Sequence, residues 1–397
     1  MQRTTKITII GSGVVGCTVA YELASHGYRN VAVVEKNSTI PGLNQSSRNG
    51  GVIHTGIYYP QEVEPLKANL CVEGSARLYE FCRRYKIPHK KTGKLVLAFN
   101  EREEELLNFF FIVGKQNGVN GLRIVMQSEV KRMEPNSGNV RRALFVPGTG
   151  IASIDSLVEK LKTLGQQKGV NFQRSTKVIR VTETTNGFNL EMLHHNQRIS
   201  METEFLINSA GLFSDEIARM VNPENSYEIV AARGEIMQFD SSMRKDIALR
   251  GIHLYSTPYF YDNETKQIAD ITSDQIHKSL KQGNVTKTLG VHLSPVLDGR
   301  TVTVGPLKTL RVGKNDYTTN LQLPRMYIDQ VHKIFPNLRV SDLRPKFSGI
   351  MAVLKGKTDF VIEKDQKYEN CIHLVGMDSP AWTSCLAIAR YVREMVT

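Results

Sequence analysis

The chain has few cysteines, the residues that stabilise small secreted or metal-bound folds, with 5 among 397 residues. It also has only 1 tryptophan. The cysteines are odd in number, widely spaced and without a Cys-x-x-Cys pair, so the sequence indicates neither a disulfide framework nor a zinc site. They are Cys17, Cys71, Cys82, Cys371 and Cys385. We therefore expect a reducing compartment and no bound metal.

Long apolar runs are also missing. The most apolar stretch, Phe109 to Val113, is far shorter than the roughly 18 residues that a membrane-spanning helix needs. Residues Met1 to Lys6 are too few to contain the apolar region of a secretory signal before the first strand begins. We expect no transmembrane segment and no export, while a peripheral membrane contact stays open.

Basic residues outnumber acidic ones by 51 to 39, which gives a net charge of +12. Such an excess suits a nucleic acid, an anionic membrane or an acidic substrate. The basic residues occur in small scattered groups such as Lys90-Lys91 and Arg141-Arg142, with no tract that interleaves them with aromatic residues. We therefore expect no nucleic-acid partner.

The first 35 residues have the pattern of a dinucleotide-binding unit. The β-branched run Lys6–Ile10 predicts a buried strand, and it ends at Gly11-Ser-Gly-Val-Val-Gly16. A helical pattern and a second strand, Val31–Val34, follow, and this strand ends at Glu35. Strand, glycines, helix, strand and terminal acid together indicate a Rossmann-type βαβ unit.

Each residue of this unit has a predicted task. Gly11 allows the tight turn, Gly13 lets the backbone approach a pyrophosphate, and Gly16 permits close packing of helix on strand. The helix N-terminus offers N–H groups and partial positive charge to the phosphates. Glu35 is expected to accept hydrogen bonds from the ribose hydroxyls. The alternative is an ordinary glycine turn before a helix, and the complete unit argues against it.

The segment after this unit favours a flavin rather than a nicotinamide cofactor. A nicotinamide-only domain should continue with more βα units, yet residues 38–56 are polar, glycine-rich and aperiodic. Helical periodicity returns over 66–85 and 102–117, and short strands are predicted over 177–181, 188–192 and 199–207. The last of these should return to the first sheet and bring a turn at Ala210-Gly211 beside the cofactor.

We predict an α/β fold with two domains. Strand-like runs over 235–239, 289–293 and 301–305 indicate a mainly antiparallel β-sheet in an α+β substrate domain. The polar, aperiodic segment 261–287 is interpreted as a surface insertion in that domain. The predicted boundaries place residues 1–80, 150–230 and 345–397 in a discontinuous Rossmann-like FAD-binding domain, and residues 81–149 and 231–344 in the substrate domain.

The block Ser46-Ser-Arg-Asn-Gly-Gly-Val-Ile-His-Thr-Gly-Ile-Tyr-Tyr-Pro60 resembles the L-2-hydroxyglutarate dehydrogenase family of the D-amino-acid-oxidase-like FAD superfamily. Further blocks agree over residues 7–390, namely Leu66–Ala68, Leu70–Gly74, Gly93–Ala98, Ala210–Leu212, Arg233-Gly234, Leu289–Ser294, Val304–Pro306, Asp359–Glu363 and Gly376–Pro380. The resemblance implies an FAD enzyme that oxidises a 2-hydroxy acid, most simply L-2-hydroxyglutarate to 2-oxoglutarate. It also implies an electron acceptor such as a quinone or an electron-transfer protein, and a mitochondrial location, with the cytoplasm as the alternative.

The resemblance also implies roles for individual residues. His54 is the candidate base, because an imidazole titrates near neutral pH. Tyr58 and Tyr59 are candidates for the pocket wall or for a substrate contact, and Arg233 is the candidate partner of a substrate carboxylate. Lys67 is a weaker candidate, because a solvated helix face explains it better, and His292 is left open between a site role and a core position. The implied FAD-binding residues are Gly11, Gly13, Val15, Gly16, Glu35, Lys36, Ser47, Arg48, Asn49, Gly50, Gly51, Val52, Val178, Ala210, Gly211, Asp378, Ser379 and Pro380.

Two positions depart from the family pattern. Met351 stands where the family commonly has an arginine, and Trp382 replaces a smaller residue beside the expected flavin site. An amine or amino-acid oxidase of the same superfamily is therefore one alternative. A flavin-binding protein without catalysis is another, which Met351 favours and His54 opposes.

Overall fold

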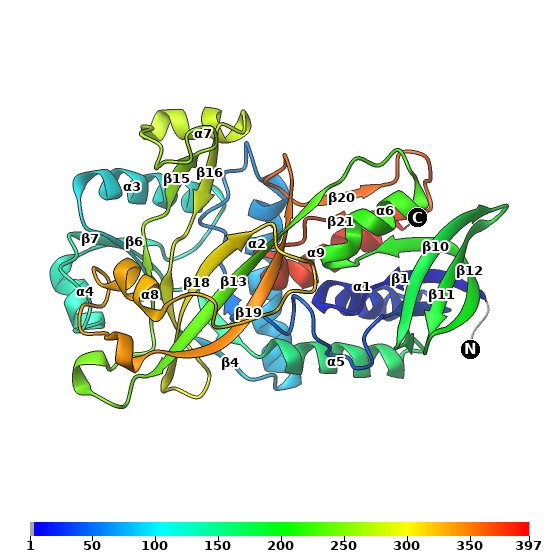
Figure 1. The fold of residues 1–397 in the computed structure, drawn as a ribbon, viewed down its shortest axis with the longest axis horizontal. Coiled ribbons are helices and arrows are strands. Elements are labelled where there is room, and N and C mark those ends of the chain that lie inside the picture. The colour runs from blue at the N-terminus through cyan, green and yellow to red at the C-terminus, as the bar shows by residue number, and fades with distance from the viewer. Residues whose placement is uncertain (1–3, 397) are drawn as a thin grey trace.

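The computed structural model describes residues 4–396 and forms two large sheets with helices packed around and between them (Figure 1). Residues 1–3 belong to the leader in which no signal is expected, and they lie outside the described residues. One sheet lies at the right of the view with α1 and β1, and the other lies at the left, with α2 and α9 between them.

The first sheet is the predicted nucleotide-binding sheet. Its strand order is β10-β11-β12-β1-β2-β9, with β21 beside β12 and β20 beside β21. β1 pairs in parallel with β2 and β12, while β10, β11 and β12 form an antiparallel meander. The strands are β1 (Thr4–Ile10), β2 (Val31–Val34), β9 (Asn171–Gln173), β10 (Thr176–Thr184), β11 (Gly187–His194), β12 (Gln197–Asn208), β20 (Val361–Lys364) and β21 (Cys371–Val375).

Helix α1 (Val14–Ser25) is the central helix of this domain. Its side chains Cys17, Val19 and Leu23 are fully buried, and it packs between α5 (Ile154–Gln167) and α9 (Ala381–Met395). Burial on several sides explains why this helix is apolar over most of its surface. α9 also packs along α2 (Pro65–Tyr85), and α6 (Ser214–Val221) follows the short helix η1 (Gly211–Phe213) at the end of β12.

The second sheet has the order β19-β13-β18-β17-β14-β5-β7-β6, and all its pairs except β5 with β14 are antiparallel. This agrees with the predicted mainly antiparallel substrate sheet. Its strands are β5 (Lys94–Ala98), β6 (Arg123–Met126), β7 (Arg142–Val146), β13 (Ile229–Asp240), β14 (His253–Ser256), β17 (His292–Pro295), β18 (Thr301–Leu310) and β19 (Arg344–Leu354). The boundary predicted at residue 345 falls inside this sheet, because β19 begins at Arg344 and pairs with β13 from there to Leu354.

Shorter elements complete the chain. Two small sheets are formed by β3 (Val52–Ile53), β4 (His89–Lys91) and β8 (Gly150–Ala152), and by β15 (Tyr259–Asp262) with β16 (Val285–Thr288). The remaining helices are α3 (Glu101–Gln116), α4 (Gln127–Met133), α7 (Ser273–Lys281), α8 (Pro324–Val331), η2 (Lys245–Ile247) and η3 (Val340–Asp342).

The segment 261–287 is more regular than its polar composition suggested. It contains α7, which begins with a capping box at Thr272 and buries Ile276 and Leu280, one turn apart. These two side chains belong to the same apolar cluster as Phe110 of α3. The segment projects at the top of the view in Figure 1, and the apolar face of α7 packs against this cluster.

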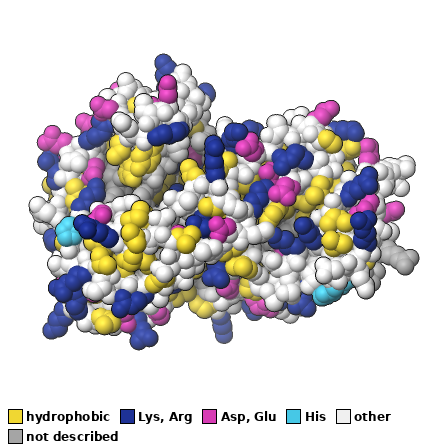
Figure 2. Space-filling view, in the orientation of Figure 1, with side chains coloured by type: hydrophobic (Ala, Val, Ile, Leu, Met, Phe, Trp, Pro, Cys, Tyr) yellow, Lys and Arg dark blue, Asp and Glu magenta, His cyan; other side chains and the backbone are white. Residues whose placement is uncertain are grey.

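The surface carries mixed charges rather than one basic patch on the visible face. Figure 2 shows Lys and Arg side chains spread over this face and interspersed with acidic ones. Among residues 4–396, no helix combines the length and the apolar character needed to cross a bilayer.

Candidate active site

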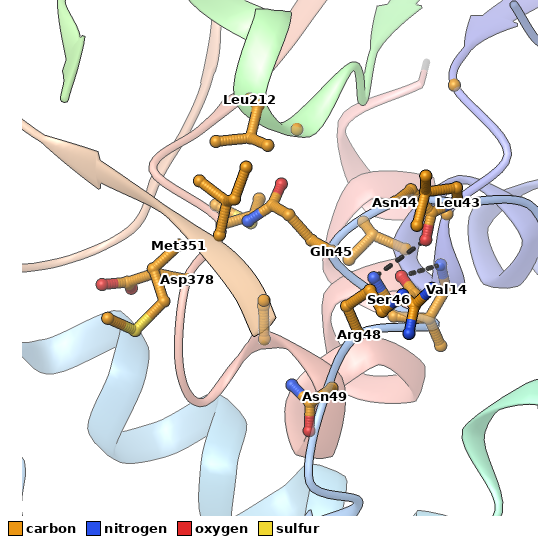
Figure 3. A pocket seen from close by; sticks show the side chains of 18 of the residues that line it. Val14, Leu43, Asn44, Gln45, Ser46, Arg48, Asn49, Leu212, Met351 and Asp378 are labelled. Atoms are coloured by element: carbon orange, nitrogen blue, oxygen red, sulfur yellow. Dashed lines mark hydrogen bonds between the residues drawn. The ribbon is translucent and has the colours of Figure 1, made fainter. Parts of the chain in front are cut away.

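A cavity of about 820 Å³ extends from the glycine turn of the first sheet to the strands of the second. At one end it is lined by the turn between β1 and α1, and at the other by His54, Tyr255, His292, Lys308 and Met351. Figure 3 shows Met351 and Asp378 on one side of the cavity, and Ser46, Arg48 and Val14 on the other. One cavity therefore joins the glycine turn of the first sheet to polar side chains from the second.

The glycine turn leaves no room for side chains. A Cβ added at Gly11, whose φ is +103°, would lie 2.5 Å from the carbonyl oxygen of Ser209, and one at Gly16 would lie 2.0 Å from that of Gly11. The backbone of the turn is therefore bare toward the cavity, with the N-terminus of α1 directly behind it. This is the cradle that a pyrophosphate requires.

Ser46 completes this end of the cavity and was missed in the sequence analysis. The N–H of Val14, in the first turn of α1, donates to Ser46 Oγ at 2.9 Å. The loop that follows β2 thus brings a hydroxyl to the helix N-terminus. The neighbouring Ser47, which was predicted to bind FAD, instead donates its hydroxyl to the Asn44 carbonyl at 3.2 Å and does not line the cavity.

Glu35 is held rigidly at the end of β2. Its Oε2 accepts from the N–H and the hydroxyl of Ser12, both at 2.8 Å, and its Oε1 accepts from the N–H of Asn37 at 2.8 Å. The carboxylate lines the cavity and retains further lone pairs for hydroxyl donors. It is positioned as a ribose-binding acid would need to be.

Most other predicted cofactor residues also line the cavity, and they come from six separate parts of the chain. Gly51 does not, and neither does Gly16, whose place is against the turn. Lys36 lies over the ring of Phe213, with its ammonium 3.6 Å from the ring centre. The lining residues from the prediction are Gly11, Gly13, Val15, Glu35, Lys36, Arg48, Asn49, Gly50, Val52, Val178, Ala210, Gly211, Asp378, Ser379 and Pro380.

His54 lies at the substrate end, directly after β3. Its backbone N–H donates to Thr383 Oγ1 of α9 at 3.0 Å, so the position of the residue does not depend on its ring. The ring Nε2 is 3.5 Å from the Ser379 hydroxyl, and Nδ1 is buried without a hydrogen-bond partner among residues 4–396. Burial and the nearby positive charge of Lys94 lower the pKa of His54 well below its usual value, so the ring is neutral and able to accept a proton at pH 7.

Lys94 is a second feature that the sequence analysis did not single out, although a lysine opening an apolar strand is a visible signal. It is buried, and its ammonium lies 4.9 Å from the ring centre of Tyr58 and 4.3 Å from that of Tyr255. Burial lowers its pKa to about 7. Tyr255 in turn stacks on His292, with ring centres 3.8 Å apart, and burial lowers the pKa of His292 to about 3. The neutral imidazoles of His54 and His292 thus line this end of the cavity, and the buried Lys94 lies near them.

Three predicted substrate contacts lie elsewhere. Tyr58 and Tyr59 are buried in the apolar cluster beneath the cavity and do not line it; Tyr58 packs edge-on against Phe110 of α3, with ring centres 5.5 Å apart. Tyr255 occupies the wall position instead. Lys67 is not solvated, because it is buried and pairs with Asp378 at 2.9 Å.

Arg233 also faces away from the cavity. It pairs with Asp316 and lies near Glu235, while its neighbours Gly234 and Ile236 line the cavity. Side chains alternate between the two faces of a strand, so β13 cannot present both Gly234 and Arg233 to the same side. Arg233, the predicted partner of a substrate carboxylate, is therefore paired with Asp316 on the face of β13 that points away from the cavity.

Replacing Lys94 by methionine is expected to move the acidic limb of the pH profile of kcat/KM to higher pH. Lys94 is charged below about pH 7 and disfavours protonation of His54, so its removal lets the pKa of His54 rise toward its usual value. The fraction of neutral His54 then falls at pH 5 to 6, and activity falls there but not at pH 8. The exposed Lys91→Met is the control, and an acidic limb that does not move would show that Lys94 does not tune His54.

Residues 6–395 match the family described as DAO, FAD dependent oxidoreductase. The chain belongs to this family. It is 31% identical to the mitochondrial L-2-hydroxyglutarate dehydrogenase of Arabidopsis thaliana, over 97% of this chain and 82% of that one. It is 30% identical to the L-2-hydroxyglutarate dehydrogenase of Indibacter alkaliphilus, over 98% of each chain. It is also 27% identical to a glycerol 3-phosphate dehydrogenase of Caloramator mitchellensis, over 98% of this chain and 73% of that one.

Solved structures agree on the fold. The L-alpha-glycerophosphate oxidase of Mycoplasma pneumoniae, in a structure with FAD bound, superposes with a TM-score of 0.82 at 24% identity, covering 100% of this chain and 95% of that one. The glycine oxidase of Geobacillus kaustophilus gives a TM-score of 0.77 at 16% identity, covering 100% and 95%. The predicted family, the α/β fold class and the FAD dependence of the enzyme are confirmed. The bare glycine turn, the fixed Glu35 carboxylate and the Ser46 hydroxyl fit this cofactor.

Proposed function

We propose that this enzyme oxidises the C2 hydroxyl of an L-2-hydroxy acid, with L-2-hydroxyglutarate as substrate and 2-oxoglutarate as product. The observation that carries the proposal is the neutral His54 imidazole at the substrate end of the cavity, with Nε2 beside the Ser379 hydroxyl. Two relatives at 30% and 31% identity, each matched over nearly the whole of this chain, are named L-2-hydroxyglutarate dehydrogenases.

The residues of the site suggest a division of labour. Bound FAD supplies the acceptor for the hydride that leaves C2. His54 Nε2 accepts the proton of the C2 hydroxyl, and the Ser379 hydroxyl, 3.5 Å from that nitrogen, orients the alcohol. Since burial, Lys94 and His292 keep the pKa of His54 low, the imidazolium returns its proton readily after the product forms. Tyr255, His292 and Trp382 wall the site against water.

Glycerol 3-phosphate is a second candidate substrate. The Caloramator relative and the Mycoplasma structure bear names that refer to this compound or its oxidation. It shares a secondary alcohol and a remote anionic group with L-2-hydroxyglutarate, so the same base would serve both.

An electron acceptor such as a quinone or an electron-transfer protein, and a mitochondrial location like that of the Arabidopsis relative, belong to the same proposal.

The test is anaerobic reduction of the bound flavin, followed by stopped-flow absorbance. L-2-hydroxyglutarate is expected to bleach the flavin, while its D enantiomer is not, because only one face of C2–H can meet His54 and the cofactor together. Glycerol 3-phosphate and glycine are run beside it. Faster bleaching by glycerol 3-phosphate would assign the second candidate, and faster bleaching by glycine would assign an amine oxidase.

A further inference from the structure

Three neighbouring strands place a lysine and a methionine on the same face of the second sheet. Gly234 of β13 pairs with Lys308 of β18 and with Gly349 of β19, while Ala232 pairs with Leu310 and with Met351. Because side chains two residues apart on a strand share a face, Lys308 and Met351 project to the same side, across β13 from each other. Lys308, Gly234 and Met351 all line the cavity.

The strand between them contributes a glycine, rather than a side chain, to the wall of the cavity. Gly234 has no side chain, and a Cβ there would lie 2.8 Å from Cβ of Pro306. Pro306 and Lys308 of β18 line the cavity beside this glycine. The Lys308 side chain is accessible and lines the cavity, and desolvation by the surrounding protein lowers its pKa.

Lys308 carries a charge that the protein does not neutralise. Among residues 4–396 it has neither an ion pair nor a side-chain hydrogen bond. The carboxylate with the strongest electrostatic attraction to the Lys308 ammonium is that of Asp378. Asp378 is already paired with Lys67, with Nζ and Oδ1 2.9 Å apart. Two ammonium groups thus share one carboxylate, which leaves one positive charge for a ligand.

The other acidic groups of this region are engaged elsewhere. Glu64 pairs with Lys287 at 2.8 Å, and Asp359 accepts the N–H groups of Leu66 and Lys67 at the start of α2, both at 2.9 Å. The remaining cations that line the cavity, Lys36, Arg48 and Lys177, belong to the segments that also supply the dinucleotide end.

Lys308 is also set apart from the base. The charge of Lys308 contributes to the low pKa of His292, whereas the low pKa of His54 comes from burial and from the neighbouring Lys94 and His292. On β18, Lys308 lies three residues past Gly305, the residue that pairs with His292 of β17. An anionic group bound there would be separated from the reacting carbon by part of the substrate chain.

We propose that Lys308 binds an anionic group of the substrate that is remote from C2, and so selects substrates that carry two ionised ends over 2-hydroxy acids with one. The inference rests on the proposed function and names its specificity residue. The anion is the distal carboxylate of L-2-hydroxyglutarate, and the phosphate of glycerol 3-phosphate shares the same chemistry. β18 thus supplies the cation that the uncharged Met351 of β19 does not.

The variant Lys308→Met tests this assignment in the FAD-loaded enzyme. Its KM for L-2-hydroxyglutarate is expected to rise about 10- to 100-fold with little change in kcat, the range of one charge-assisted hydrogen bond. Its kcat/KM for L-2-hydroxybutyrate, which lacks the distal carboxylate, should stay within twofold. Lys308→Arg should retain the preference, and Lys355→Met, which removes an exposed lysine paired with Glu228, is the matched control. Equal loss on both acids would overturn the inference.

A second variant moves the charge without changing its number. In Lys308→Met/Met351→Lys the ammonium passes to the other side of Gly234 on the same face, and preference for the dicarboxylate is expected to recover in part. Calorimetric titration supplies a readout without turnover: 2-oxoglutarate should bind Lys308→Met at least 10-fold more weakly than wild type, while 2-oxobutyrate should bind both alike. Equal weakening, or none, would contradict the proposal.

The panel separates this inference from the proposed function. If only glycerol 3-phosphate reduces the flavin, the proposed substrate is wrong, and a higher KM for glycerol 3-phosphate in Lys308→Met, with no change for glycerol, still supports the role of Lys308. If L-2-hydroxyglutarate reduces the flavin equally well in wild type and Lys308→Met, the proposed function stands and the inference is wrong.

Discussion

Replacing His54 by glutamine is expected to lower kcat by roughly 10²- to 10⁴-fold, the usual contribution of a general base. The flavin spectrum and the thermal stability should stay close to those of the wild type. The structure explains this separation, because the bond from His54 to Thr383 uses the backbone N–H, which glutamine retains. Stopped-flow reduction rates with saturating L-2-hydroxyglutarate, together with the FAD content of each protein, measure both effects.

Two companion variants sharpen that experiment. His332→Gln changes an exposed histidine at the end of α8 and should leave turnover unchanged. Ser379→Ala removes the hydroxyl beside Nε2 and should cost less than the loss of the base itself. Since the pKa of His54 is lowered, the wild-type rate should persist below pH 6 and fall only at lower pH, where the ring becomes protonated. Unimpaired turnover in His54→Gln would leave this histidine with a structural role alone.

The parts of the fold that follow from local chemistry were predictable from the sequence. The unit from β1 to Glu35 depends on a buried strand, three glycines and a helix that are adjacent in the chain, so its pattern contains most of its geometry. The meander of β10 to β12 was predicted for the same reason, because short alternating strands with an Asn-Gly turn pair with their neighbours.

The orientation of single side chains was less accessible. Arg233 and Gly234 are adjacent, and only the register of β13 between β18 and β19 determines which of them faces the cavity. Lys67 looks like a solvated helix residue until the distant turn at Asp378 folds beside it. Lys94 and Tyr255 meet through the parallel pair of β5 and β14, which no local pattern indicates. Resemblance to a family identified the segments of the site, while long-range packing determined which side chains reach it.

Replacing Gly16 by alanine is expected to abolish stable FAD retention. The new Cβ would lie 2.0 Å from the carbonyl oxygen of Gly11 and 2.7 Å from the hydroxyl of Ser209, so α1 must shift away from the turn that it supports. Overpacking of this kind costs about 1 to 3 kcal/mol, which corresponds to a fall in Tm of roughly 1 to 4 °C for a chain of 397 residues.

The loss of FAD should exceed what that destabilisation alone would cause, because the N-terminus of α1 and the backbone of the Gly11 turn must both face the pyrophosphate. Gly313→Ala is the matched control, since it changes an exposed glycine whose Cβ would meet only Cβ of Asp316, at 3.7 Å. FAD content after gel filtration and the thermal transition of both proteins measure the two effects separately. Stoichiometric FAD and an unchanged Tm in Gly16→Ala would mean that the turn can relax, and that close helix-on-strand packing at this position is not what holds the cofactor.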